Sequence, residues 1–313
     1  MPPLSQILAL GAGIGLAYFG PILTQLAVHR LQELNLARTP EPHPSDPAAS
    51  ASGVEWTCGP DNYTTELISL DPLVVYIHNL VSPREADLII KAGEPLLEPS
   101  PVTGYGAAGG TRAQSRTSWS APLPGDDAAV ACVLARARRF LGTLLAPRRD
   151  EMGVAQMVRY TAGQKFDLHH DWFRQPRLLD GDGARGRRRL YNRVATFFVV
   201  LQDGCSEGET YFPQIRPIAP QDWGKEAGDI GGGGAAAEGD DGVSGGKKQQ
   251  AVWRMHEQGG MAFRPVRGNA LFWVNLMANG SGDPRVLHAG LPVGDGMKTA
   301  MNIWPRTFFG PDA

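Results

Sequence analysis

Cysteine is scarce in this sequence, and its scarcity argues against several kinds of metal site. Only Cys58, Cys132 and Cys205 occur, without a CxxC pair or a Cys/His zinc spacing. Zinc fingers and related thiolate centres need closely spaced ligands of that kind. Three cysteines allow one disulfide at most, and the sequence does not say which pair would form it.

An excess of charge of one sign is also absent. The chain of 313 residues has a formal net charge of −2 and a pI of about 6.4. Proteins that bind nucleic acid are usually basic, so no nucleic-acid partner is expected. The length suits one large catalytic domain with appendages or two small domains, and a hydrophobic content of 42% allows a buried core.

Charged side chains are missing altogether from residues 4–28. A bilayer is crossed by about 20 apolar residues in a helix, so residues 1–30 are predicted to be a signal-anchor or transmembrane segment. Gly20 and Pro21 interrupt the run, and no Lys or Arg precedes it, so the charges do not define an orientation. A buried or amphipathic N-terminal helix is the alternative.

Two further segments have compositions that do not favour packing. Residues 31–54 are expected to be a linker, because positions 38–53 are rich in Pro, Ala and Ser. Residues 224–250 are low in complexity and rich in Gly, and they predict a disordered insertion between two strands. Residues 55–313 are therefore expected to form one domain that contains this insertion.

Helical signals dominate the first half of that domain, and strand signals dominate the second. Ser82, Pro83 and Glu85 form a capping-box sequence that opens a helix through about Ala92, and residues 126–145 have helical periodicity. Short apolar runs predict strands at 73–80, 154–160, 194–201, 260–263, 270–273 and 299–304. The order indicates an α+β protein in which N-terminal helices support a mainly β core, a sandwich or a barrel.

The motif best suited to chemistry is His169-His170-Asp171. Residues two apart on a strand point to one face, so His169 and Asp171 would project into the same cavity while His170 faces away. A third ligand must come from elsewhere, and His288 is the best candidate. Two imidazoles and a carboxylate suit iron(II) with positions open for O₂ and a co-substrate; catalytic zinc is the rival.

Lys298 and Tyr160 would add an anion site beside that metal. Lys298 lies at the start of the last predicted strand, and a lysine directed into a barrel interior needs an anion. Tyr160 lies on the predicted strand before His169, where its hydroxyl could donate to the same anion. The alternatives are an exposed lysine at a strand edge and an ordinary core tyrosine.

The ordered set of motifs around these residues resembles the prolyl 4-hydroxylase family. The match runs from about Val74 to Trp304 and includes Ser115–Ser118, Val158–Asp171, Asn192–Leu201, Gly208–Pro213, Gly268–Trp273, His288–Gly290 and Lys298. The resemblance implies a double-stranded β-helix (jelly-roll) core for residues 55–313. It also implies a dioxygenase that uses Fe(II), 2-oxoglutarate, O₂ and usually ascorbate.

The resemblance further implies a role for each matching residue. His169, Asp171 and His288 match the iron ligands, Lys298 matches the residue that binds the C5 carboxylate of 2-oxoglutarate, and Tyr160 and Thr196 line that pocket. No catalytic side chain is implied beyond the metal centre. The expected reaction hydroxylates a prolyl residue of a peptide or protein substrate while 2-oxoglutarate is decarboxylated to succinate.

Two departures from the family pattern concern the substrate. Phe166 stands where the family often has Tyr, and Arg306 stands where it often has His. The same chemistry on a different substrate therefore stays open, as does a catalytically silent jelly roll that binds a metal or a peptide. The intact set of three ligands with Lys298 argues against the silent module.

Two remaining features concern partners and location. Seven arginines lie between positions 174 and 193, either in a substrate loop that favours an anionic partner or in a solvated loop. The N-terminal segment and the resemblance favour the endoplasmic reticulum membrane or the secretory pathway, with a cytoplasmic protein as the alternative. Sequons at Asn62 and Asn279 would matter only in a secretory lumen.

Overall fold

A computed structural model describes residues 56–101, 115–146, 149–179, 188–218 and 251–310. The described residues all belong to one compact unit, which begins at Trp56. The predicted signal-anchor at 1–30, the linker at 31–54 and the insertion at 224–250 lie outside the described residues. None of the described helices is long and apolar enough to cross a membrane.

Two α-helices begin at the caps that the sequence provides. Helix α2 (Pro83–Gly93) has a complete capping box, in which the Ser82 hydroxyl accepts from the backbone of Glu85 and the Glu85 carboxylate accepts from the backbone of Ser82. Helix α4 (Ala128–Leu141) begins after Asp127, whose carboxylate accepts from two backbone amides of the first turn. Short 3₁₀ turns are η1 (Glu94–Leu96), η2 (Gly142–Leu144) and η4 (Pro284–Val286). Both predicted helices are confirmed.

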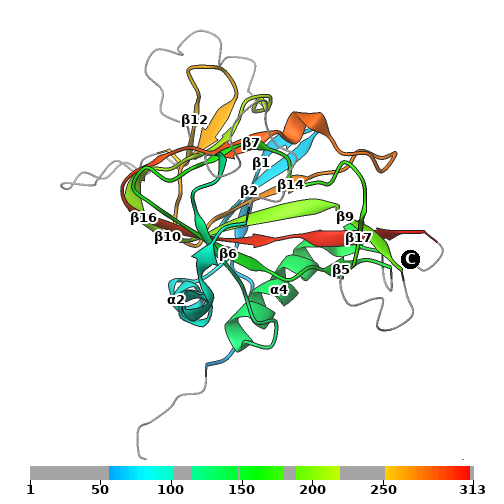
Figure 1. The fold of residues 1–313 in the computed structure, drawn as a ribbon, viewed down its shortest axis with the longest axis horizontal. Helices are drawn as coiled ribbons and strands as arrows, with labels where there is room; N and C mark the ends of the chain where they lie inside the picture. The colour runs from blue at the N-terminus through cyan, green and yellow to red at the C-terminus, as the bar shows by residue number, and fades with distance from the viewer. Residues whose placement is uncertain (1–55, 102–114, 147–148, 180–187, 219–250, 311–313) are drawn as a thin grey trace, which may run out of the picture. The chain divides into compact units, whose positions relative to one another are not determined.

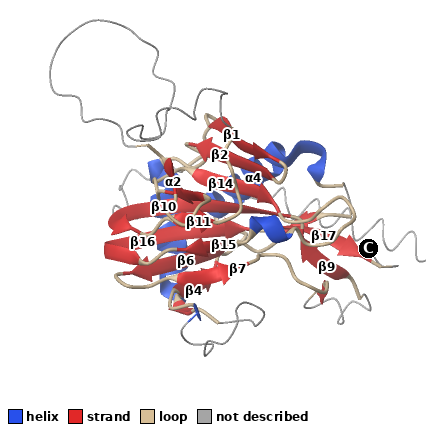
Figure 2. Cartoon of the chain, turned by 90° about the horizontal axis from the view of Figure 1, so that it is seen from above, coloured by secondary structure: helices blue, strands red, loops and turns tan. Residues whose placement is uncertain are grey.

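The strands form three antiparallel sheets. The largest has the order β1-β2-β14-β10-β16-β6-β4-β3, and Figure 2 labels its strands from β1 to β4. Its strands are β1 (Thr64–Leu70), β2 (Leu73–His78), β14 (Ala270–Val274), β10 (Ala195–Glu207), β16 (Val293–Ile303), β6 (Gln156–Thr161), β4 (Trp119–Pro122) and β3 (Glu98–Pro99). The smaller sheet consists of β12 (Trp253–Met255), β13 (Met261–Phe263), β11 (Thr210–Phe212), β15 (His288–Gly290) and β7 (Phe166–His169). The third consists of β5 (Glu151–Met152), β17 (Pro305–Phe309), β9 (Leu190–Arg193) and β8 (Arg177–Leu178).

Side-chain alternation gives the large sheet two differently packed faces. On β2, Val75 and Ile77 belong to the core shared with helices α2 and α4. Val74 and Tyr76 instead pack with residues of the smaller sheet such as Phe212. Figure 1 shows the helices on one side of the large sheet, with β7 and β12 of the smaller sheet on the other. This arrangement confirms the predicted mainly β jelly roll with supporting helices.

The same alternation selects the residues that face the smaller sheet near the centre of the large one. Phe197, Met301 and Met157 point into the helix-side core. Phe198 on β10, Lys298 on β16 and Tyr160 on β6 are one or three positions away from these residues on the same strands. Their side chains therefore point to the opposite face, toward the smaller sheet. Lys298 and Tyr160 are direct cross-strand partners.

The strand containing Lys298 differs from its prediction. Residues 299–304 were expected to be the last strand, but β16 starts at Val293 and β17 follows it. Gly294, Asp295 and Gly296 have low strand propensity, which hides the first half of β16 in the sequence. Pairing with the extended β10 holds that half in place, through a bulge between Cys205 and Glu207. Lys298 is therefore in the middle of a strand.

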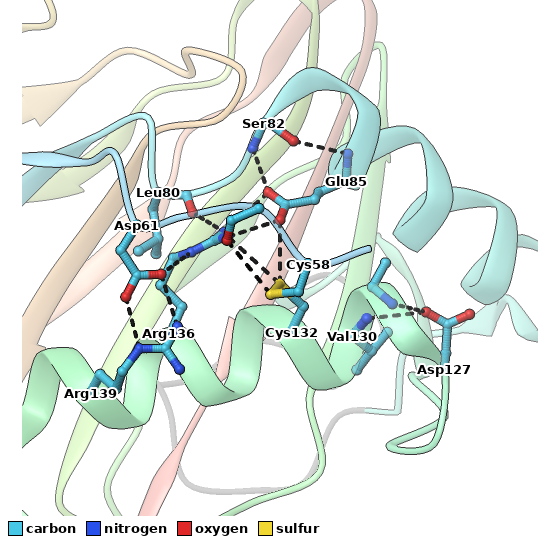
Figure 3. Close-up of a disulfide and its surroundings, with 12 residues drawn as sticks. Cys58, Asp61, Leu80, Ser82, Glu85, Asp127, Val130, Cys132, Arg136 and Arg139 are labelled. Carbon is cyan, nitrogen blue, oxygen red and sulfur yellow. Dashed lines mark hydrogen bonds and ion pairs between the residues drawn. A yellow bond between two sulfur atoms is a disulfide. The ribbon is translucent and has the colours of Figure 1, made fainter. Parts of the chain in front are cut away.

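A disulfide and a buried ion pair attach the N-terminal end of this unit to helix α4 (Figure 3). Cys58 is bonded to Cys132, and Cys205 is a free, partly buried thiol. Beside the disulfide, Arg136 donates to both carboxylate oxygens of Glu85, at 2.9 and 3.0 Å, and to Asp61. The guanidinium of Arg136 thereby links the segment before β1, helix α2 and helix α4.

Candidate active site

Strand pairing places two histidines side by side. His288 on β15 is the cross-strand partner of His169 on β7, and their ring centroids are 4.3 Å apart. The Nδ1 atom of His169 lies 2.7 Å from the Asp167 carbonyl oxygen, and that of His288 lies 3.0 Å from the Val286 carbonyl oxygen. A carbonyl only accepts, so each Nδ1 carries the proton and donates it. Each Nε2 is left with a lone pair for a metal.

Asp171 completes this group from a position just beyond the end of β7. Its Oδ1 is 3.9 Å from Nε2 of His169, and its Oδ2 is 3.9 Å from Nε2 of His288. One ligand atom from each of the three residues lies within 4.8 Å of the others. Two nitrogen donors and one carboxylate suit a divalent transition metal that keeps open positions, so the residues fit the iron(II) that the resemblance implies.

The electrostatics of the site favour the protonation states that a metal needs. Burial lowers the pKa of His169 to about 3, and repulsion from His288 adds to the effect. Burial also lowers the pKa of His288. For Asp171, burial acts in the opposite direction, but His288, His169 and Arg193 outweigh it and hold its pKa below the usual value. Two neutral imidazoles and an ionised carboxylate result near neutral pH.

Thr196 orients the Asp171 carboxylate through a hydrogen bond. Its fully buried hydroxyl donates to Oδ2 of Asp171 at 2.8 Å, and it accepts from the side-chain amide of Asn275 at 2.8 Å. The resemblance implied that Thr196 lines the 2-oxoglutarate pocket, and the structure places its hydroxyl against the candidate metal ligand Asp171. The sequence reasoning missed Asn275, because no motif signals a residue that acts through a second side chain.

His170 does not join the metal group. Its Nε2 lies 3.1 Å from the Pro284 carbonyl oxygen, and its ring lies against that of Trp172. The expectation that His170 faces away from Asp171 agrees with these contacts. Another cluster of potential ligands, Cys58, Glu85 and Cys132, has both sulfurs in the disulfide and is not available to a metal.

A cavity of about 150 Å³ opens beside the three ligands, and Lys298 lies in its wall. The Lys298 side chain is buried, and its Nζ donates to the Gly208 carbonyl oxygen at 2.5 Å. The ammonium also lies 5.0 Å from the centre of the Tyr160 ring. In the described part of the chain, no carboxylate forms an ion pair with Lys298. A buried ammonium with donors to spare fits the distal carboxylate of 2-oxoglutarate.

Phe166 and Arg116 also line this cavity. The Phe166 ring lies on that of His169 at 3.6 Å between centroids, and the Arg116 guanidinium lies over the Phe166 ring at 4.7 Å from its centre. Phe166 therefore fixes the orientation of a candidate ligand by packing alone, since it has no hydroxyl.

Arg193 and Trp304 shape the cavity mouth, and the sequence reasoning did not select them. The Arg193 guanidinium lies 3.6 Å from the centre of the Trp304 ring and donates to the Asp171 carbonyl oxygen at 3.2 Å. Burial, reinforced by the cations of Arg177 and Arg306, lowers the pKa of Arg193 to about 10. Among the described residues, the indole N–H of Trp304 is buried without an acceptor.

Comparisons with known proteins agree with this geometry. A family model described as the 2OG-Fe(II) oxygenase superfamily matches residues 155–306. Prolyl 4-hydroxylase 1 of Arabidopsis thaliana is 26% identical over 245 residues, which cover 78% of this chain and 72% of that protein. Prolyl 4-hydroxylase 5 of the same plant is 27% identical over 241 residues, covering 76% and 70%.

Solved structures are also similar to this chain, and one of them is a viral enzyme. The viral collagen prolyl hydroxylase of Paramecium Bursaria Chlorella virus-1, in its 2OG complex, covers 75% of this chain and 96% of its own. Its sequence identity is 20% and the TM-score is 0.47. The matched stretch 155–306 contains the three candidate ligands together with Tyr160 and Lys298. The resemblance to prolyl 4-hydroxylases is thus confirmed, and residues 155–306 of this chain match the 2OG-Fe(II) oxygenase superfamily.

Proposed function

We propose that this protein is an Fe(II)- and 2-oxoglutarate-dependent dioxygenase that hydroxylates prolyl residues in peptides or proteins. One observation supports this most strongly: His169, Asp171 and His288 share a cavity with a buried Lys298 that no described carboxylate pairs with. The relatives, which are named prolyl 4-hydroxylases, suggest the substrate class.

Each side chain has a definable part in this reaction. When bound, Fe(II) and 2-oxoglutarate would supply O₂ activation and electrons, with release of succinate and CO₂. His169, His288 and Asp171 hold the metal, and Thr196 keeps the Asp171 carboxylate in place. Lys298 binds the distal carboxylate and so orients the co-substrate. Arg193 and Trp304 place the peptide at the cavity mouth and exclude water from it.

A second candidate keeps the chemistry and changes the target. Phe166 stacks on His169 and offers no hydroxyl to a substrate, and Arg306 brings a cation near the cavity mouth. Both residues alter the surroundings in which a prolyl ring would lie. Hydroxylation of another side chain is the outcome that these two residues favour.

The deciding experiment measures succinate and the hydroxylated peptide together. The purified full chain is incubated with Fe(II), 2-oxoglutarate, ascorbate and a panel of proline-rich peptides, with His169→Ala as the inactive reference. Peptide-dependent succinate with one oxygen added to proline supports the proposal. Oxygen added elsewhere supports the second candidate. If the protein bound iron but formed no succinate, the remaining hypothesis would be a catalytically silent jelly roll that binds a metal or a peptide.

We further propose that the protein works in the secretory pathway, anchored to the endoplasmic reticulum membrane through residues 1–30, and that ascorbate maintains its iron. The uncharged N-terminal run and the Cys58–Cys132 disulfide support this location, because disulfides persist in oxidising compartments. Asn62 and Asn279 are exposed, so a lumenal domain would expose both sequons to glycosylation. A mobility shift of the expressed protein on endoglycosidase treatment tests the location, and loss of the shift in Asn62→Gln/Asn279→Gln identifies the sites.

A further inference from the structure

A second cavity continues the candidate active site along the third sheet. Its volume is about 230 Å³, and it shares Gln156, Arg193 and Trp304 with the cavity that holds the metal ligands. The two cavities are therefore adjacent, and a peptide with one residue beside the metal would bring its neighbouring residues close to the second cavity. Arg306 lies in its wall, together with Tyr191.

Strand pairing and the packing of nearby residues fix the position of Arg306. On β17, it is the cross-strand partner of both Glu151 and Arg193. Its guanidinium lies 4.9 Å from the centre of the Tyr191 ring. Gly153 leaves the room for it, since a Cβ there would come within 2.8 Å of Nε of Arg306. The side chain is 17% exposed, so it is held in the wall and still reaches solvent.

The charge around Arg306 is unbalanced. Two arginines, Arg193 and Arg306, are directly opposite each other, and like charges in that arrangement destabilise a sheet. Among the residues that the structure describes, no Asp or Glu lines the second cavity. The carboxylate of Glu151 lies 3.5 Å from Arg306 and 4.0 Å from Arg189, so it is shared between two cations. A further carboxylate in the cavity would relieve the repulsion.

We propose that the second cavity binds an acidic side chain of the substrate peptide, close in sequence to the hydroxylated residue, and that Arg306 is the specificity-determining residue. This inference rests on the proposed function. A peptide carboxylate fits because Arg presents several N–H donors in a plane, and Glu151 occupies only part of them.

The first test needs no mutation. Peptides with a Glu placed in turn at each of the positions flanking the target residue are compared with their Gln counterparts, by peptide-dependent succinate formation. We expect one Glu position to raise kcat/KM by about threefold to tenfold over Gln, the size of effect of a partly exposed charged contact. Equal values at every position would overturn the inference and leave the proposed function intact. If none of the peptides supported succinate formation, both the inference and the proposed peptide hydroxylation would be contradicted.

Variants of Arg306 separate a specific contact from a structural one. Arg306→Gln should bring the ratio of kcat/KM for the Glu and Gln peptides down to about one, and Arg306→Glu should favour Lys at the same position. Arg139→Gln is the matched control, because Arg139 on α4 also pairs with a carboxylate but lies outside both cavities. A preference for Glu that persists in Arg306→Gln, or an equal loss with both peptides, would refute the assignment.

Discussion

His288 and His169 face each other across the paired strands β15 and β7, although 119 positions, the difference between their residue numbers, separate them in the chain. Each donates its Nδ1 proton to a backbone carbonyl within its own segment, which turns both Nε2 atoms toward Asp171. The strand pairing therefore creates the metal site, and each histidine is oriented before any metal arrives.

Removing a strand-borne ligand should greatly weaken metal binding. We expect His288→Ala to bind Fe(II) more than about 100-fold more weakly, because only two ligands remain. His170→Ala should keep one metal per chain, since the Nε2 of His170 interacts with the Pro284 carbonyl oxygen. Metal content after dialysis, together with succinate formation, measures both variants. Normal metal content in His288→Ala would contradict the ligand assignment.

Thr196→Val should weaken the metal site without removing a ligand. The change leaves the side-chain amide of Asn275 and one oxygen of Asp171 without their partner, so Asp171 loses its orientation. We expect a loss of about tenfold in Fe(II) affinity and of about 1 to 3 kcal/mol in the free energy of unfolding.

The matched control for that prediction is Thr299→Val. Thr299 is equally buried, but its hydroxyl bonds to Gln202 and Arg159 and lies on the helix-facing side of the large sheet. Thr299→Val should lose similar stability and keep its Fe(II) affinity. If both variants lost affinity equally, the effect of Thr196 would be a general consequence of destabilisation.

Lys298→Met should raise the KM for 2-oxoglutarate and make it independent of pH. Burial lowers the pKa of Lys298 from 10.5 to about 8, so the free enzyme carries the cation below that pH and loses it above. In the wild type, KM should therefore rise above that pH, by about tenfold one pH unit beyond the pKa. A wild-type KM that stays flat through this range would remove Lys298 from the role of carboxylate ligand.

The same pKa predicts how Lys298 affects stability. Between about 8 and 10.5, the unfolded chain holds a proton that the folded protein has released. The free energy of unfolding should therefore rise with pH in this window, and this rise should be absent in Lys298→Met. Denaturant titrations across the window test the sign.

Arg136→Met should strongly destabilise the domain. The side chains of Arg136 and Glu85 are 4% and 2% exposed, so the variant would leave a buried carboxylate without its cation. Such a loss costs about 3 to 5 kcal/mol, whereas Arg139→Met, at an exposed site, should cost less than about 1 kcal/mol. Urea denaturation compares the two. Equal losses would mean that the Arg136 network seen in Figure 3 contributes little.

Reducing the disulfide should lower stability and spare the metal site. Cys58 and Cys132 are 74 residues apart in the sequence. A cross-link of that span restricts the unfolded chain and so raises the free energy of unfolding by about 2 to 4 kcal/mol. Cys58→Ser should therefore show a lower Tm and an unchanged Fe(II) affinity, because the bond lies on the helix side of the large sheet. A Tm that is unaffected by either reduction or substitution would contradict this expectation.

The sequence by itself determined the parts of the protein whose signals are local. The capping box at Ser82 starts α2, and short apolar runs predict β2, β6 and β14, because these elements depend on neighbours a few residues away. His169 and Asp171 were recognisable for the same reason. His288 and Lys298 were candidates from their places beside predicted strands, and the ordered family motifs implied their roles.

Only the tertiary structure decided which distant residues support these motifs. Asn275 behind Thr196, Arg193 against Trp304, and Arg306 opposite Arg193 are brought together by sheet pairing, which leaves no periodic signal in the sequence. The full length of β16 was hidden as well, because its glycine-containing first half is extended only through pairing with β10. Contacts across a sheet depend on register, and register is set by the whole fold rather than by local propensity.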